Sequence, residues 1–267
     1  MTTRRTIITG GSSGLGLALA HALAKEGDEL VLIARDPAKL ESAAEEIRSK
    51  ITGTKVAYYS VDVSDAGALQ QTMDTIVKEM GGIDLLINSA GILREASFEE
   101  TTDAIFRQTF DINLFGVINC CRAALPSLKE NNGTIVNIAS MASHAGVYGY
   151  TAYCASKHAL KGFTESLYYE LKPQGVRVQI ICPPEFDSPM VDALDENRSA
   201  ENRAQTQMVP KEPVEVIVRD CMKAIHSGRY HTVTGFKARL ARFGVQHFPD
   251  LTRKVAEGVI SRVQKNQ

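Results

Sequence analysis

The chain has 267 residues, of which 44% are hydrophobic and 23% charged, and its formal net charge is -1. This composition is typical of an ordinary soluble protein, and the length suits a single large domain spanning 1–267. Because the charge is balanced, a global attraction to nucleic acid is excluded, and partners must be sought in local features.

Short apolar runs alternate with longer segments of helical periodicity, which predict strands and helices respectively. We expect strands at 5–9, 29–34, 55–60, 84–87, 134–139 and 177–182. We expect helices at 15–26, 37–50, 66–79, 103–129 and 151–172. This alternation indicates a Rossmann-like α/β fold, a doubly wound parallel sheet in three layers with helices on both faces.

The cysteines and histidines predict neither disulfides nor a metal centre. The five cysteines are odd in number, lack C-x-x-C spacing and lie mostly in apolar runs. The six histidines show no H-x-x-x-H or Cys/His spacing, so we expect no metal. A strand-like run that begins at residue 6 leaves no room for a signal peptide, which favours a reducing, cytoplasmic location.

The first expected strand leads into a glycine-rich turn and then into a helix rich in Ala and Leu. Such a turn lets backbone amides and a helix N-terminus face a pyrophosphate. No Gly-Lys-Ser/Thr follows, which excludes a Walker A loop. The alternative is a tight turn without a ligand. The candidate cofactor contacts in this turn are Gly10, Ser12, Ser13, Gly14, Leu15 and Gly16.

Arg35 follows the second expected strand, about twenty residues after the glycines. An acidic residue at this place would bind the ribose 2'-hydroxyl of NAD, whereas an arginine can pair with the 2'-phosphate of NADP. The sequence therefore favours NADP(H), with a solvated loop charge as the alternative.

Two further strand ends carry candidate cofactor contacts. Asp62 and Val63 close the third strand, where a carboxylate can accept a hydrogen bond from the adenine amino group. Asn88, Ala90 and Gly91 close the fourth, where small residues let the backbone approach the ribose and nicotinamide. A plain turn would use the same residue types.

Tyr153 and Lys157 are four residues apart in a strongly helical stretch, so both side chains project from one face. Lowering a tyrosine pKa from ~10 to ~7 requires about 4 kcal/mol of preferential phenolate stabilisation. An ammonium roughly 4 Å away supplies ~4 kcal/mol at an effective dielectric of about 20. The pair therefore predicts an acid/base tyrosine assisted by a lysine.

Ser140 ends the fifth expected strand, at the edge where ligands bind in open parallel sheets, and can orient a substrate oxygen. Ser143 is a rival that lies three residues into the loop. Asn113 interrupts an apolar helical run and either bonds a local carbonyl or maintains a water and proton relay to the lysine. His144 and His158 are candidates for the base of a serine hydrolase, but the absence of a G-x-S-x-G elbow argues against that function.

Together, these residues resemble the short-chain dehydrogenase/reductase family over roughly residues 4–190. The resemblance implies that Tyr153 is the acid/base, that Lys157 also holds the nicotinamide ribose and that Ser140 positions the carbonyl. It further implies that Asn113 maintains the relay. A homodimer or homotetramer built on the helices 103–129 and 151–172 is expected as well.

Within the family, residues 149–157 and 182–189 resemble the 3-ketodihydrosphingosine reductases. Where most relatives have Pro-Gly, this chain has Pro183 and a second proline, and Ser188 replaces a more usual threonine. We expect Pro183 and Ser188 to lie at the nicotinamide amide. The resemblance implies NADPH-dependent reduction of a 3-keto group on a long-chain lipid. Residues 185–212 are polar, acidic at first and without strong periodicity, which is typical of a lid, a binding loop or disorder, and we expect a substrate lid there.

The C-terminal segment 236–267 carries seven basic and two acidic residues, interleaved with apolar residues at near-helical spacing. Such a segment can contact an anionic membrane surface or pack on the core or a partner subunit. Two other functions stay open. One is reduction of a 3-oxoacyl thioester or another hydrophobic ketone, or the reverse alcohol oxidation. The other is NADP binding without turnover.

Overall fold

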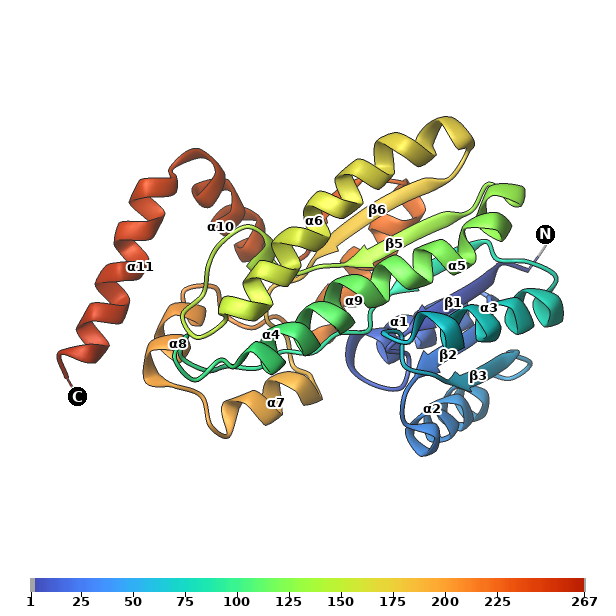
Figure 1. Cartoon of the computed structure of the whole chain (residues 1–267), viewed down its shortest axis with the longest axis horizontal. Coiled ribbons are helices and arrows are strands. Elements are labelled where there is room, and N and C mark those ends of the chain that lie inside the picture. The colour runs from blue at the N-terminus through green and yellow to red at the C-terminus, as the bar shows by residue number, and fades with distance from the viewer. Residues whose placement is uncertain (1–2, 267) are drawn as a thin grey trace.

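The computed structural model describes residues 3–266 and contains one seven-stranded parallel sheet with the order β3-β2-β1-β4-β5-β6-β7 (Figure 1). The six predicted strands are confirmed, each to within one residue at either end. β7 was not predicted, because it has only three residues and two of them are polar. The strands are β1 (Arg5–Thr9), β2 (Glu29–Ala34), β3 (Val56–Ser60), β4 (Leu85–Asn88), β5 (Thr134–Ile138), β6 (Arg177–Cys182) and β7 (His231–Val233).

Helices cover both faces of the sheet, as expected for a doubly wound fold. On β1, Ile7 packs with α3, α5 and α6, whereas the next residue, Ile8, packs with α1, α2 and α9. Successive side chains point to opposite faces of a strand, so each strand contributes to both cores. These helices are α1 (Gly14–Lys25), α2 (Pro37–Lys50), α3 (Ala66–Met80), α5 (Gly116–Glu130), α6 (Thr151–Leu171) and α9 (Val214–Ser227).

The chain crosses from one half of the sheet to the other between β3 and β4, so β1 and β4 are neighbours whose connections leave in opposite directions. In open α/β sheets, ligands bind at such a switch point, outside the carboxyl ends of the strands. The predicted residues after β1, β4, β5 and β6 all meet at this edge.

The single helix predicted at 103–129 is wrong. It is divided into α4 (Asp103–Phe110), a π-helical turn at Asp111–Phe115 and α5. The π turn contains Asn113, whose fully buried side chain makes hydrogen bonds outside its own helix. Helical periodicity did not reveal this wider turn, because one inserted residue barely disturbs the apolar pattern.

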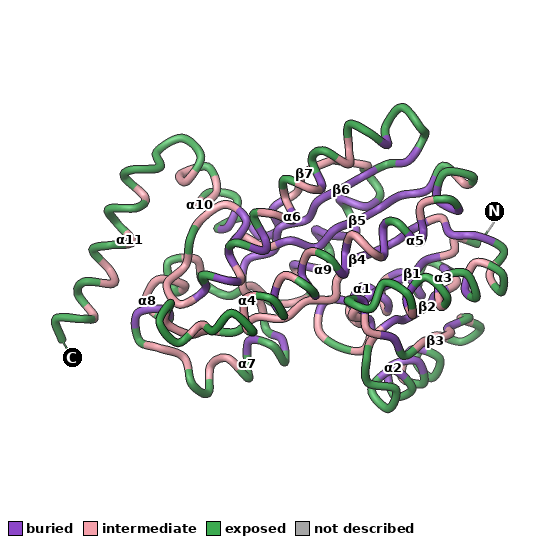
Figure 2. Tube along the Cα trace, viewed as in Figure 1, coloured by how far each residue is buried: buried purple, intermediate pink, exposed green. Residues whose placement is uncertain are grey.

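The chain after β6 is more regular than the expected loop. It forms α7 (Pro189–Asp195) and α8 (Ala200–Thr206) before α9, and then α10 (Phe236–His247) and α11 (Pro249–Gln264) after β7. Figure 2 shows α10 and α11 as a largely exposed arm, and α11 has no buried residue. No helix among residues 3–266 is long and apolar enough to cross a membrane.

Candidate active site

A cavity of about 1200 Å³ lies at the carboxyl edge of the sheet. Its walls come from the glycine-rich turn, the ends of β4, β5 and β6, the first turns of α6, and the segments around α7, α8, α10 and α11. Most of the predicted site residues converge on it. The predicted residues that line it are Gly10, Ser13, Gly14, Leu15, Gly16, Ala90, Gly91, Ser140, Tyr153, Lys157, Pro183 and Ser188.

The glycine-rich turn is shaped to receive a ligand at the N-terminus of α1. A Cβ on Gly16 would lie 2.3 Å from the carbonyl oxygen of Gly10, so only glycine lets the turn close against the helix. Gly14 has φ +54° and faces open space, with no atom within 4 Å of an added Cβ. Ser13 makes no side-chain cap, which leaves the first amides of α1 free to bind an anion. These features fit a dinucleotide pyrophosphate.

The turn after β4 is joined to the glycine-rich turn by Thr9, whose hydroxyl oxygen accepts hydrogen bonds from the amides of Ser89 (3.1 Å) and Ala90 (3.2 Å). Asn88, by contrast, does not line the cavity. Its amide donates to Oδ1 of Asn137 at 2.9 Å within the sheet. Asn88 therefore ties β4 to β5, and only the small residues after it reach the cavity.

Four other predicted cofactor contacts lie outside the cavity lining, namely Ser12, Arg35, Asp62 and Val63. The guanidinium of Arg35 is 60% exposed and sits 3.9 Å from a carboxylate oxygen of Asp62. Val63 is buried in the core, and its carbonyl accepts a hydrogen bond from Asn119 at 3.1 Å. Arg35 thus has most of its surface free for a phosphate at the end of β2, and Asp62 is the one carboxylate among the described residues that comes within 4.0 Å of its guanidinium.

Ser140, Tyr153 and Lys157 meet where β5 ends and α6 begins. Ser140 caps the short 3-10 turn Met141–Ser143 and hydrogen-bonds Tyr153. The ammonium of Lys157 lies 5.7 Å from the centroid of the Tyr153 ring and donates to the Ile138 carbonyl at 3.0 Å. The rival Ser143 is fully buried and donates to the Ser140 carbonyl at 2.5 Å, so its hydroxyl does not reach the cavity.

The expectation that the lysine brings the tyrosine pKa to neutrality is wrong for this structure. Burial raises the pKa of Tyr153 to about 12, although the hydrogen bond from Ser140 opposes the shift. Burial also lowers the pKa of Lys157 to about 8. Desolvation disfavours whichever form is charged, and it is the largest influence on the pKa of both groups. At neutral pH the phenol is protonated and ready to act as an acid.

Asn113 connects the loop after β4 to α6. Its Oδ1 accepts from the Ile92 amide at 2.8 Å, and its Nδ2 donates to the Ile92 carbonyl at 2.9 Å and to Ser156 Oγ at 3.1 Å. A Cβ on Gly91 would lie 3.2 Å from Oδ1 of Asn113 and 3.8 Å from Nζ of Lys157. Asn113 bonds residues far away in the sequence rather than a local carbonyl, and it holds the cofactor side of the site against the helix that carries Tyr153.

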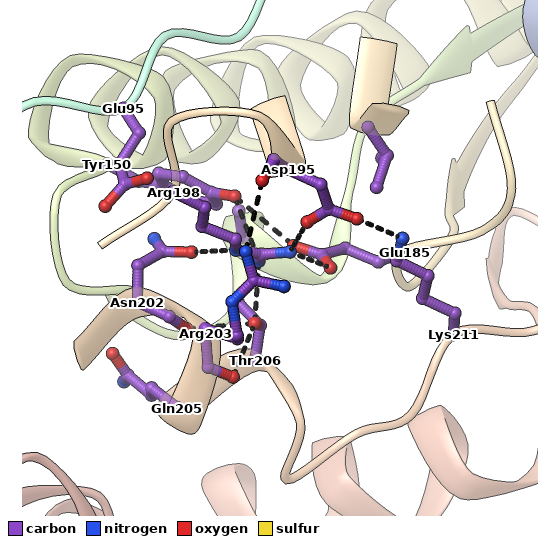
Figure 3. Close-up of polar contacts among 12 residues, drawn as sticks. Glu95, Tyr150, Glu185, Asp195, Arg198, Asn202, Arg203, Gln205, Thr206 and Lys211 are labelled. Atoms are coloured by element: carbon purple, nitrogen blue, oxygen red, sulfur yellow. Dashed lines mark hydrogen bonds and ion pairs between the residues drawn. The ribbon is translucent and has the colours of Figure 1, made fainter. Parts of the chain in front are cut away.

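Sequence reasoning missed the polar network that organises residues 185–212, shown in Figure 3. Arg198 has a side chain only 3% exposed and pairs with Glu185 (2.5 Å) and Asp195 (3.0 Å). It also donates to the hydroxyl of Tyr150 at 3.3 Å, beside the first turn of α6. Lys211 pairs with Asp195 at 2.6 Å. The acidic residues at the start of this segment are visible in the sequence, but Arg198 lies thirteen residues from Glu185 and only the fold reveals the pairing.

A doubly wound sheet whose switch point joins a glycine-rich turn to a Ser-Tyr-Lys group defines a nicotinamide-dependent oxidoreductase. A sequence model described as "short chain dehydrogenase" matches residues 4–199, and the chain belongs to that family.

Comparisons with individual proteins agree with this assignment. The chain is 34% identical over 225 residues to a 3-ketodihydrosphingosine reductase of Bos taurus, covering 81% of this chain and 68% of that protein. It is 32% identical over 198 residues to a 3-oxoacyl-(acyl-carrier-protein) reductase of Chlamydia muridarum, covering 74% and 79%. A short chain dehydrogenase/reductase of Burkholderia phymatum, solved in complex with NAD, superposes with a TM-score of 0.82 at 25% identity, covering 93% and 95%.

Proposed function

We propose that this chain uses NADPH to reduce the 3-keto group of a long-chain lipid, with 3-ketodihydrosphingosine as the leading substrate. The proposal is carried by one observation. A single cavity joins the glycine-rich turn and the Ser140–Tyr153–Lys157 group to an extended apolar wall. A cofactor, a reacting carbonyl and an alkyl chain can therefore be accommodated side by side.

The cofactor end of the cavity is expected to hold NADPH, which supplies the hydride when bound. The amides at the start of α1 would receive the pyrophosphate, and Arg35 would pair with the 2'-phosphate. Lys157 would hold the nicotinamide ribose. Pro183 and Ser188 line the cavity beside Tyr153 and would border the nicotinamide amide. NADPH rather than NADH is favoured because a bound 2'-phosphate gives the exposed guanidinium a charge-assisted partner.

At the chemical end, Ser140 would hold the substrate carbonyl oxygen while Tyr153 gives its proton to that oxygen as the alkoxide develops. The raised pKa of Tyr153 keeps the phenol protonated at neutral pH but makes it a weaker acid. The transfer is still favourable, because the developing alkoxide is a stronger base than the phenolate that remains. Lys157 would stabilise the phenolate that remains. Asn113 acts as a positioning residue, because its hydrogen bonds link the loop after β4 to α6.

The substrate end is apolar and long. Its walls include side chains from the lid segment 185–212 and from both helices of the C-terminal arm, among them Met190, Met208, Leu240, Val245 and Ile260. We assign 185–212 as the substrate lid, which Arg198 holds in place through Glu185 and Tyr150. An alkyl chain gains about 0.8 kcal/mol for each buried CH₂, so a wall of this kind favours long-chain ketones.

The exposed side of the C-terminal arm supports peripheral contact with an anionic membrane surface. Large apolar side chains are exposed there, namely Phe236, Leu240, Phe243, Phe248, Leu251 and Val255. Seven basic residues of 236–267 accompany them, against two acidic ones. Since the same helices line the cavity, a lipid could enter from the membrane without crossing water.

We also expect a homodimer or homotetramer that uses the faces of α5 and α6, where Tyr169 of α6 is 66% exposed. Light scattering coupled to size-exclusion chromatography measures the state directly. A Tyr169→Lys variant should shift the mass toward the monomer, and an unchanged mass would place the interface elsewhere.

The test of function follows NADPH absorbance with purified protein. It compares 3-ketodihydrosphingosine in detergent with a short 3-oxoacyl thioester, and uses NADH as the cofactor control. We expect preferred turnover of the sphingoid ketone with NADPH. Preferred turnover of the thioester would assign acyl-chain reduction, which the similarity to the Chlamydia protein keeps as the second candidate. Tight NADPH binding with no turnover of any ketone would overturn both.

A further inference from the structure

Three potential metal ligands that are far apart in the sequence meet beside the cavity. His144 follows the 3-10 turn after β5, Cys182 ends β6, and His231 begins β7. The two Nε2 atoms of the histidines lie 3.1 Å apart, and Sγ of Cys182 lies 3.7 Å from Nε2 of His231. All three potential ligand atoms are within 4.8 Å of one another.

These separations match the edges of a tetrahedral zinc site. With Zn–N near 2.0–2.1 Å and Zn–S near 2.3 Å, tetrahedral angles place two nitrogens roughly 3.3 Å apart and a nitrogen and a sulfur roughly 3.6 Å apart. The observed 3.1 and 3.7 Å require only small adjustments. Because each ligand comes from a different element, a bound ion would join the loop after β5 to the last two strands of the sheet.

A polar side chain already lies beside the cysteine sulfur. Oγ of Ser143 is 3.5 Å from Sγ of Cys182, and either atom could be the donor. Ser143 also donates to the Ser140 carbonyl, so its proton must turn from that carbonyl to the sulfur when an ion binds. Outer hydrogen bonds of this kind orient and stabilise metal ligands.

Two neighbouring cations oppose a divalent ion and set the expected affinity. Nζ of Lys161 lies 3.3 Å from Nδ1 of His144, and the charges of Lys161 and Arg242 both act on the histidine pair. A metal on Nε2 requires a proton on Nδ1, so Lys161 must give up that contact when an ion binds. Lys161 is partly exposed and can turn toward solvent.

From this cluster we propose a zinc site formed by His144, Cys182 and His231, with a fourth position open to water. His144 lines the cavity, which gives the ion a path of entry. The histidine and cysteine spacings in the sequence gave no sign of the site, because its ligands become neighbours only through the order of β5, β6 and β7. The proposal does not depend on which ketone the enzyme reduces.

The test uses full-length protein freed of metal with a chelator and titrated with zinc chloride alone by calorimetry, with a thermal melt at each zinc concentration. We expect one zinc per chain and a higher melting temperature. Cys182→Ser and His231→Gln should each weaken zinc binding by more than the roughly 10- to 100-fold that loss of an outer-shell partner costs. His226→Gln on α9 and Cys120→Ser in the core are the matched controls and should leave binding unchanged.

Two further measurements separate a built site from surface association. Cobalt should give a thiolate charge-transfer band in the near ultraviolet that Cys182→Ser abolishes. Lys161→Met should tighten zinc binding, because it removes the opposing charge, whereas Lys223→Met on the exposed face of α9 should not. If Cys182→Ser fails to fold, the loss of zinc affinity is measured with His231→Gln instead. The proposal is overturned if zinc does not saturate at one per chain or if neither ligand variant weakens binding.

Discussion

Lys157 should limit the stability of the fold while it enables the reaction. Its side chain is 5% exposed, and burial lowers its pKa from 10.5 to about 8. A difference of that size corresponds to about 3 kcal/mol of folding free energy at pH 7, at 1.36 kcal/mol per unit. Lys157→Met keeps the length and volume of the side chain but removes the charge. It also loses the hydrogen bond to the Ile138 carbonyl, which costs about 1 kcal/mol.

We therefore expect Lys157→Met to stabilise the protein by about 2 kcal/mol at pH 7 and to lose most of its reductase activity. The sign of the pH dependence follows from proton binding. Between pH 8 and 10.5 the unfolded chain holds more protons at this lysine than the folded chain, so wild-type stability rises with pH. The advantage of the variant is then full below pH 8 and nearly gone by about pH 10.

Urea denaturation at pH 7 and pH 10, at one fixed protein concentration, measures both effects. Lys172→Met is the control, because Lys172 lies just after the same helix with an exposed ammonium, and its removal should leave the stability nearly unchanged. The reasoning fails if Lys157→Met is less stable than wild type at pH 7, or if its advantage persists unchanged at pH 10.

Substitutions at three further residues test the site. Tyr153→Phe should lower turnover by about 10²- to 10⁴-fold while fluorescence titration shows unchanged NADPH affinity, and a wild-type rate would remove Tyr153 from the chemistry. Arg35→Ala should reduce kcat/KM with NADPH by roughly 10- to 100-fold and leave the NADH rate unchanged, and an equal loss with both cofactors would refute the phosphate pairing. Arg198→Met leaves Glu185 and its neighbours without their buried partner, so we expect a loss of about 3 kcal/mol, a raised KM for long-chain ketones and faster proteolysis within 185–212. Arg198→Lys should rescue little of this, because one ammonium cannot replace a forked guanidinium.

Much of the fold and the meeting of Ser140, Tyr153 and Lys157 could be predicted, because the relevant signals are local. Continuous apolar runs located six strands, and the four-residue spacing of Tyr153 and Lys157 placed both on one helix face. Parallel strands present their carboxyl ends at one edge of the sheet, and this rule predicts that Ser140 lies near Tyr153 and Lys157. Each of these steps needs only periodicity within one element or a general property of sheets.

The remainder depends on contacts between elements, which periodicity does not encode. β7 is a three-residue strand that pairs with β6, and Arg198 acquires its role only through contacts such as its hydrogen bond to Tyr150, 48 residues away in the sequence. The tyrosine pKa was misjudged for the same reason, because a sequence gives the charges of neighbours but not the depth at which they are buried.

Asn113 shows how far local reasoning reaches. An asparagine inside an apolar helix is unfavourable unless its amide finds partners, so the sequence correctly marked the position as special. The partners, Ile92 and Ser156, lie 21 and 43 residues away, and the amide meets them from a π-helical turn between α4 and α5. The π-helical turn and the hydrogen bonds of Asn113 therefore belong together. The fold tolerates a weaker helix at this point because the three hydrogen bonds of Asn113, two to Ile92 and one to Ser156, link the loop after β4 to the helix that carries Tyr153.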